Sequence, residues 1–159
     1  MTDEMSEDLV PEPAPKDAIV VGHDGSGGGD LAFASAVELA DRLGASVVVV
    51  RAWSIATAPR PPTWKFGYVS SFEELADTVR DHLVQDVSTH LQRFPGIEVD
   101  YRAVHGNPAK NLIAISKQAR MLVVGSRGLG GFAGMVLGSV SDQCVRYAAC
   151  PVLVVRKRD

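Results

Sequence analysis

The sequence has few of the features that mark secreted, membrane-spanning or nucleic-acid-binding proteins. Only two cysteines occur in 159 residues, which excludes the disulfide framework that stabilises many small secreted domains. No apolar run approaches the roughly 20 residues that a membrane-spanning helix needs, and the first residues lack the basic start and apolar core of a signal peptide. We therefore expect a cytoplasmic protein with no membrane contact.

Basic charge and metal-binding patterns are also scarce. Lysine and arginine together number 16, against 19 aspartates and glutamates, which gives a net charge of -3. A nucleic-acid partner is not expected, because no basic stripe is available to replace the counterions of phosphates. The histidines show no metal-ligand spacing, and no order of Ser, His and Asp indicates a catalytic nucleophile. The sequence thus predicts no catalytic residues.

What the chain does contain is a regular alternation of apolar segments and helical patterns. Residues 46–52 include four consecutive valines, as in a parallel strand that is covered on both faces, whereas residues 98–104 alternate between apolar and charged side chains, as in an edge strand. Strands that alternate with helices form right-handed crossovers in an open parallel sheet. We therefore predict an α/β fold with a single open five-stranded parallel sheet and helices on both faces, a Rossmann-like arrangement. The expected strands are residues 18–22, 46–52, 98–104, 121–125 and 151–156.

Capping residues locate the ends of the expected helices. Gly44 follows the first helical pattern as a stop signal, and Pro95 and Gly96 end the second. Asn107 is a suitable cap for a third helix, with Pro108 at its first position. The last helix is expected to span about residues 139–149.

A glycine-rich segment follows the expected strand at residues 121–125. Gly125 is separated from Gly128 by two residues, and Gly138 follows after nine more. A phosphate must approach backbone N–H groups closely, and a Cβ atom on that path would clash or forbid the positive φ angles that turn successive amides inward. The order of strand, glycine loop and helix start is therefore typical of a phosphate-binding site.

The helix that follows this loop has features that favour an anion. Ser139 and Ser141 open the helix, where free N–H groups and the positive end of the dipole attract negative charge, and both carry hydroxyl groups for hydrogen bonds. Arg127 supplies a full positive charge. A loop that merely turns the chain remains the alternative for a segment of this composition.

The spacing of these glycines resembles that of the ATP-binding branch of the universal stress protein family, and the resemblance covers nearly all of residues 18–156. It implies an adenine nucleotide alpha hydrolase-like fold for a single nucleotide-binding domain at residues 18–159. Residues 1–17 are acidic and contain three alternating prolines, so we expect a disordered tail there.

The resemblance also implies which residues bind the nucleotide, at the carboxyl ends of the strands where ligands of such sheets bind. Asp24 matches the nucleotide-contacting aspartate of the family, although His23 stands where the family more often has an apolar residue. The end of the valine strand offers an apolar slot for adenine, and Val104 either helps to sandwich the base or is an ordinary core residue. The full set is Asp24, Val50, Ala52, Val104, Gly125, Arg127, Gly128, Gly138, Ser139, Val140 and Ser141.

The family resemblance implies a regulator rather than an enzyme. We expect an ATP-binding protein of the stress response, in which Mg²⁺ accompanies the phosphates and hydrolysis is at most slow. A downstream protein partner would read the nucleotide state. The resemblance also implies a homodimer through the last strand, and the segment Pro151–Val155 is apolar enough to pair in this way; a simple edge strand within a monomer is the alternative.

Three alternatives remain open at this stage. The same fold could prefer cyclic AMP or AMP, or it could be an interaction module with an empty cleft. Ser26–Asp30 resembles the Ser-Gly-Gly-x-Asp-Ser loop of adenylating ATP pyrophosphatases, but Leu31 replaces the closing serine.

The long segment 53–72 is rich in proline and aromatic residues, and it is either a lid, a partner surface or simple packing over the helix that follows.

Overall fold

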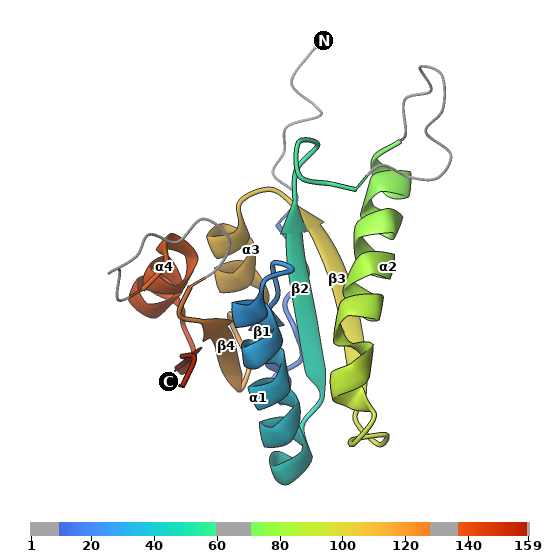
Figure 1. Cartoon of the computed structure of the whole chain (residues 1–159). Helices are drawn as coiled ribbons and strands as arrows, with labels where there is room; N and C mark the ends of the chain where they lie inside the picture. The colour runs from blue at the N-terminus through green and yellow to red at the C-terminus, as the bar shows by residue number, and fades with distance from the viewer. Residues whose placement is uncertain (1–9, 60–70, 128–136, 159) are drawn as a thin grey trace.

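Strands and helices alternate along the described part of the chain, as the sequence predicts. The computed structural model describes residues 10–59, 71–127 and 137–158 (Figure 1). The strands are β1 (Ile19–Gly22), β2 (Val47–Trp53), β3 (Val99–His105), β4 (Met121–Gly125) and β5 (Val152–Val155). The helices are α1 (Gly27–Leu43), α2 (Phe72–Leu91), α3 (Pro108–Ile115) and α4 (Ser139–Tyr147).

Within the described residues the strands form one five-stranded sheet in the order β3-β2-β1-β4-β5. Every neighbouring pair is parallel, with Val21 of β1 paired to Val49 of β2 and to Val123 of β4. The predicted α/β fold is therefore confirmed, and β3 lies at an edge as its alternating pattern indicates. In the part of the chain that the structure describes, no helix is long and apolar enough to cross a membrane.

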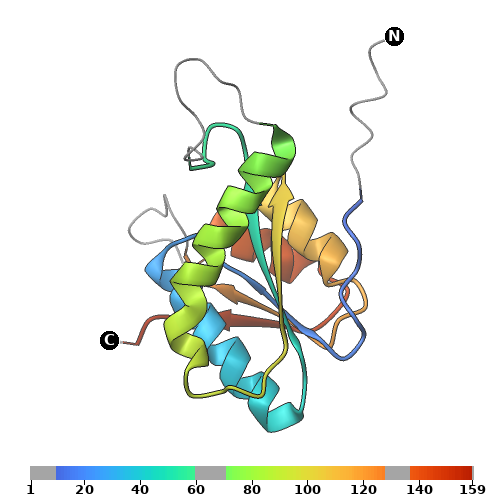
Figure 2. The same cartoon turned by 90° about the vertical axis from the view of Figure 1, so that its right-hand side faces the viewer.

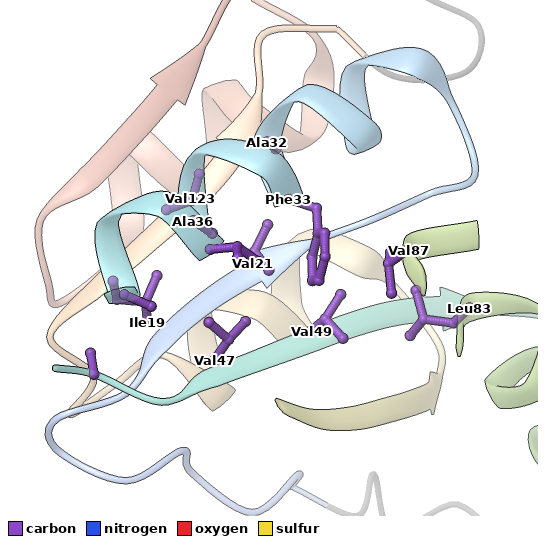
Figure 3. Close-up of a cluster of buried hydrophobic side chains, with 13 residues drawn as sticks. Ile19, Val21, Ala32, Phe33, Ala36, Val47, Val49, Leu83, Val87 and Val123 are labelled. Atoms are coloured by element: carbon purple, nitrogen blue, oxygen red, sulfur yellow. The ribbon is translucent and has the colours of Figure 1, made fainter. Parts of the chain in front are cut away.

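The helices cover both faces of the sheet, which explains the unbroken run of valines in β2. Figure 2 shows α1 and α2 in front of the sheet and α3 and α4 behind it. Val47 and Val49 pack under α1 and α2, whereas Val48 and Val50 face α3 and α4. In Figure 3, Phe33 of α1 lies close to Val49, and it is fully buried. Both sides of β2 are thus removed from water, as parallel strands require.

Two of the predicted capping signals lie at helix ends, whereas α2 ends at Leu91, before the predicted Pro95 and Gly96. Gly44 adopts a left-handed conformation with φ of 66° at the end of α1, which an L side chain would strain. Asn107 accepts a hydrogen bond from the backbone N–H of Lys110 at 3.0 Å, and Pro108 follows at the first position of α3. Gly44 thus ends α1 shortly before β2 begins, and Asn107 starts α3 shortly after β3 ends.

The structure differs from the expected disordered tail in residues 10–17. Ala14 is fully buried, and its N–H donates to the carbonyl oxygen of Ile115 at 2.8 Å. Its own carbonyl accepts from the Gln118 side chain at 3.0 Å, and the Arg102 guanidinium donates to the carbonyl of Glu12. This segment runs beside α3 (Figure 2). Its small buried side chain and two backbone hydrogen bonds offset the conformational entropy that the segment loses when it becomes ordered. Residues 1–9 lie outside the described part.

Candidate functional site

A cavity of about 500 Å³ opens at the carboxyl ends of the central strands. It lies where β1 separates β2 from β4, so the chain connections leave in opposite directions, which is the point at which ligands bind in open parallel sheets. The lining residues come from the carboxyl ends of β1, β2 and β4, from the loops that follow β1 to β4, and from α1, α3 and the start of α4. The topology therefore places the cavity where the sequence predicts the site.

Nine of the eleven residues predicted to bind nucleotide line this cavity: Asp24, Val50, Ala52, Gly125, Arg127, Gly138, Ser139, Val140 and Ser141. Val104 is not among the lining residues; it pairs with Ala52 across β2 and β3 and packs against the core beneath α3 and α4. Of the two readings of Val104, the ordinary core residue fits this position better. Gly128 lies outside the described residues.

One end of the cavity is apolar. Val50 and Ala52 of β2 line it together with Leu112 of α3 and Val124 of β4. Gly22 leaves room for Leu112, since a Cβ atom there would lie 2.9 Å from its Cδ1 atom. Gly106, with φ of 116°, lines the same region. This end can accept a flat apolar ring system.

The opposite end combines the loop after β4 with the start of α4. Gly138 is the N-cap of α4 and supplies no side-chain acceptor to the first N–H groups of the helix. Ser139, Val140 and Ser141 form the first turn and line the cavity. Unpaired N–H groups and the helix dipole favour an anion at this position.

Ser141 lines the cavity, and its hydroxyl also makes hydrogen bonds within the loop. Its side chain is 3% exposed, and its hydroxyl donates to the carbonyl oxygens of Ser126 and Gly138 at 3.1 and 3.0 Å. The N–H of Gly138 donates to the same Ser126 oxygen at 2.6 Å. Because the hydroxyl proton is engaged with these carbonyls, Ser141 fixes the two ends of the glycine loop to each other. The hydroxyl of exposed Ser139 is better placed to reach a ligand.

Close contact between α1 and the end of β4 explains part of the glycine pattern. A Cβ atom at Gly28 would lie 2.3 Å from the carbonyl oxygen of Arg127, and one at Gly125 would lie 2.8 Å from the carbonyl oxygen of Gly28. Gly29 similarly faces His23 at 3.2 Å. Packing therefore explains two of the three glycines between Ser26 and Asp30, namely Gly28 and Gly29, whereas a Cβ atom at Gly27 would meet nothing within 4 Å.

The loop between β1 and α1 carries Asp24, whose carboxylate accepts hydrogen bonds from the N–H and the hydroxyl of Ser26. His23 before it is 2% exposed and lines the cavity. Its Nε2 lies 2.8 Å from the Asp30 carboxylate, and its Nδ1 lies 2.6 Å from the guanidinium of Arg51. The sequence singled out His23 only as a departure from the family, and it gave no signal for Arg51.

Several other lining residues were not predicted, and they lie near the ends of strands, in the loop after β2, or in α1 and α3. They are Gly22, Gly29, Trp53, Ser54, Thr57, Pro108, Leu112 and Val124. Trp53 is buried, with its ring centroid 5.5 Å from that of Phe72 and 4.9 Å from that of His105. The aromatic residues at positions 60–70 lie outside the described part of the chain, so the lid and partner-surface readings of that segment stay predictions.

Cys144 is a buried free cysteine among the described residues. Burial raises the pKa of the Cys144 thiol to about 11, and the neighbouring Cys150 adds to the rise, so Cys144 is protonated at neutral pH. Among the residues that the structure describes, no group of three or more His, Cys, Asp and Glu side chains is arranged to hold a metal ion. The arrangement is suited to binding a ligand with an apolar end and an anionic end.

Comparisons with known proteins agree with this architecture. A universal stress protein of Mycolicibacterium smegmatis is 37% identical over 142 residues, which are 88% of this chain and 46% of that protein. The chain therefore spans about half the length of the relatives that it matches. A universal stress protein solved in complex with cAMP has a TM-score of 0.63 at 24% identity, over 89% of this chain and 98% of that one.

A second solved structure shares the fold. The universal stress protein from Archaeoglobus fulgidus in complex with dAMP has a TM-score of 0.58 at 18% identity, over 92% of this chain and 98% of that one. The sequence profile of the universal stress protein family (Usp) matches residues 16–156, which is nearly the whole chain. The chain belongs to the universal stress protein family.

Proposed function

We propose that the protein binds an adenine nucleotide, with ATP as the first candidate, and acts as a nucleotide-dependent regulator in the stress response. The observation that carries this proposal is the cavity itself, which joins an apolar slot to the N-terminus of α4 across a glycine loop. Similar proteins solved with cAMP and dAMP support an adenine nucleotide as the ligand class.

The proposed pose follows the polarity of the cavity. The base lies in the slot between Val50, Ala52 and Leu112, because burial of its apolar faces is favourable there. The ribose hydroxyls approach the Asp24 carboxylate. The phosphates reach the first turn of α4 and Arg127, where backbone N–H groups and a positive charge stabilise them.

Mg²⁺ fits this arrangement as a companion of the phosphates. Magnesium is usually held by one or two carboxylates together with phosphate oxygens and water. Asp24 provides a carboxylate among the described lining residues, and phosphate oxygens would supply other ligands. The ion would neutralise part of the phosphate charge near Asp24.

A regulatory role is favoured over rapid turnover. His23 lines the cavity, but both of its ring nitrogens are engaged with protein groups, so it is not available as a general base. We therefore expect at most slow ATP hydrolysis and a downstream protein partner that reads the nucleotide state. The cytoplasmic location expected from the sequence belongs to this proposal.

We also propose a homodimer through residues 151–155. Strand β5 lies at the edge of the sheet, and its four residues are each only partly buried. An apolar edge strand of this kind is stabilised by pairing with a second copy. Val154→Lys should convert dimers to monomers in sedimentation equilibrium, and a wild-type monomer would contradict the assignment.

The nucleotide proposal is tested by calorimetric titration of the protein after removal of copurifying nucleotide. MgATP, AMP and cyclic AMP are titrated separately, and release of phosphate and pyrophosphate is measured in parallel. Tight ATP binding without pyrophosphate release supports the proposal. Preference for cyclic AMP or AMP would identify the second candidate function, which the cAMP and dAMP complexes of related folds favour. Absence of binding to all three nucleotides would contradict the nucleotide proposal and favour an interaction module.

A further inference from the structure

Arg51 connects the loop beside the cavity to helix α2. It lies on β2, and its side chain is only 12% exposed. Its Nε donates to the carbonyl oxygen of His23 at 3.2 Å, and its Nη2 lies 2.6 Å from Nδ1 of the same residue. Nη2 also donates to the carboxylate of Asp86 on α2 at 2.8 Å. One guanidinium therefore fixes both the backbone and the ring of His23.

These contacts determine which ring nitrogen of His23 carries the proton. Nδ1 receives the N–H of Gly25 at 3.1 Å, and it also faces the guanidinium of Arg51, which can only donate. Nδ1 is therefore an acceptor without a proton. Nε2 carries the proton and donates it to Asp30 of α1 at 2.8 Å. Nε2 of His90 on α2 lies 4.0 Å from the same carboxylate.

The contacts that Arg51 and Asp30 make with His23 also restrict the next residue, Asp24. His23 and Asp24 both line the cavity, and Gly25 turns the chain with φ of 88°. Because His23 is held by β2 through Arg51 and by α1 through Asp30, the backbone that carries Asp24 has little freedom. Arg51 itself is not among the lining residues, so its hydrogen bonds reach the cavity through this loop.

We propose that Arg51 is a positioning residue of the nucleotide site, which holds the His23 ring in its Nε2–H form and thereby orients the Asp24 carboxylate. Asp86 in turn fixes the guanidinium from α2. The inference rests on the proposed function, since it names a residue that prepares the same cavity for the ribose and phosphates. It also links the exposed surface of α2 at Asp86 to the cavity, because Asp86 is 43% exposed.

The test compares Arg51→Met, which keeps the apolar stem, with Arg51→Lys, which keeps the charge but loses the planar fork. Arg42→Met is the matched control, because within the described part of the chain the ion pair of Arg42 is with Glu38, on the exposed surface of α1. Binding of MgATP by calorimetry, or of AMP if AMP binds more tightly, is measured alongside urea unfolding. Arg51→Met and Arg51→Lys should each weaken binding about tenfold, which corresponds to about 1.4 kcal/mol. Arg42→Met should stay within about twofold.

A spectroscopic measurement on the ligand-free protein tests the geometry independently of nucleotide. In ¹⁵N-labelled wild-type protein, the His23 resonances should show an unprotonated Nδ1 and a protonated Nε2. The opposite tautomer would overturn the inference. Wild-type affinity in Arg51→Lys would also overturn it, because charge alone would then suffice without the bidentate geometry.

A milder variant keeps the test decisive if Arg51→Met does not fold. Asp86→Asn removes the ionic anchor of Arg51 at the surface and leaves the core intact, and it should weaken binding by about twofold to fivefold. Unchanged affinity in this variant, with a wild-type protein that binds, would overturn only the positioning role. Failure of the wild type to bind any adenine nucleotide would overturn the proposed function and this role in it. The tautomer spectrum would still test whether Arg51 and Asp30 hold the His23 ring in its Nε2–H form.

Discussion

Two adjacent glycines at the start of α1 allow a direct test of the contact between this helix and the loop after β4. A Cβ atom at Gly28 would lie 2.3 Å from the carbonyl oxygen of Arg127, whereas a Cβ atom at Gly27 meets nothing within 4 Å. The two substitutions Gly28→Ala and Gly27→Ala therefore add the same methyl group to the same helical turn. Only the first of them forces the backbone of the glycine loop to move.

The magnitude follows from the space available. Ordinary contact begins at 3.4 Å, so Arg127 or α1 must move by roughly 1 Å to accept the methyl group at Gly28. Overpacking of this kind costs about 1 to 3 kcal/mol. Alanine in place of glycine in a helix gains about 0.5 to 1 kcal/mol, mainly through the unfolded chain. We therefore expect Gly28→Ala to lose about 1 to 2 kcal/mol, and Gly27→Ala to gain about 0.5 kcal/mol.

The free energy of unfolding is measured by urea denaturation at equilibrium, and nucleotide affinity by calorimetry. Because the Arg127 carbonyl belongs to the loop that leads to α4, Gly28→Ala should also weaken nucleotide binding about tenfold, or about 1.4 kcal/mol. Gly27→Ala should bind like the wild type. Equal stability of the two variants would refute the argument that Gly28 is required by close packing.

Three further predictions concern the loop, a helix cap and a thiol. Ser141→Ala should lose about 1 kcal/mol of stability in urea, because the carbonyls that its hydroxyl holds lose their donor, whereas Ser139→Ala should stay within about 0.5 kcal/mol. Asn107→Ala should lose about 1 kcal/mol in the same assay, since the cap of α3 is removed, and an unchanged midpoint would exclude this cap as a source of stability. Cys150 should react with an aromatic disulfide reagent at pH 8 well before Cys144, whose raised pKa of about 11 leaves it protonated; equal rates would contradict its burial.

The fold could be predicted from the sequence because its signals are local. The four valines of β2 pair with both neighbouring strands and need burial on both faces, and Gly44 and Asn107 act within their own turns. Docking of Ala14 could not be predicted, since its hydrogen-bond partner Ile115 lies about a hundred residues away in the chain. From the sequence alone, a short proline-rich segment is therefore predicted to be disordered, although tertiary contacts order part of it.

For the candidate site, the sequence indicates the location of the cavity but not the contacts of individual side chains. Strand ends and the spacing from Gly125 to Gly138 indicate where the cavity forms, because topology brings the carboxyl ends of parallel strands together. Arg51 gave no signal, since its partners His23 and Asp86 are 28 and 35 residues away and it follows a run of buried valines. The engagement of Ser141 with two backbone carbonyls likewise depends on the folded loop.

The central claim is that an adenine nucleotide occupies the cavity between β1, β2 and the start of α4. The most direct test is a titration of ¹⁵N-labelled protein with MgATP, in which the resolved glycine amides are followed by NMR. We predict large shifts for Gly125 and Gly138, which line the cavity, and none for Gly44 and Gly96 at the opposite ends of the strands. Unchanged amide resonances of Gly125 and Gly138 at saturating nucleotide would contradict this claim.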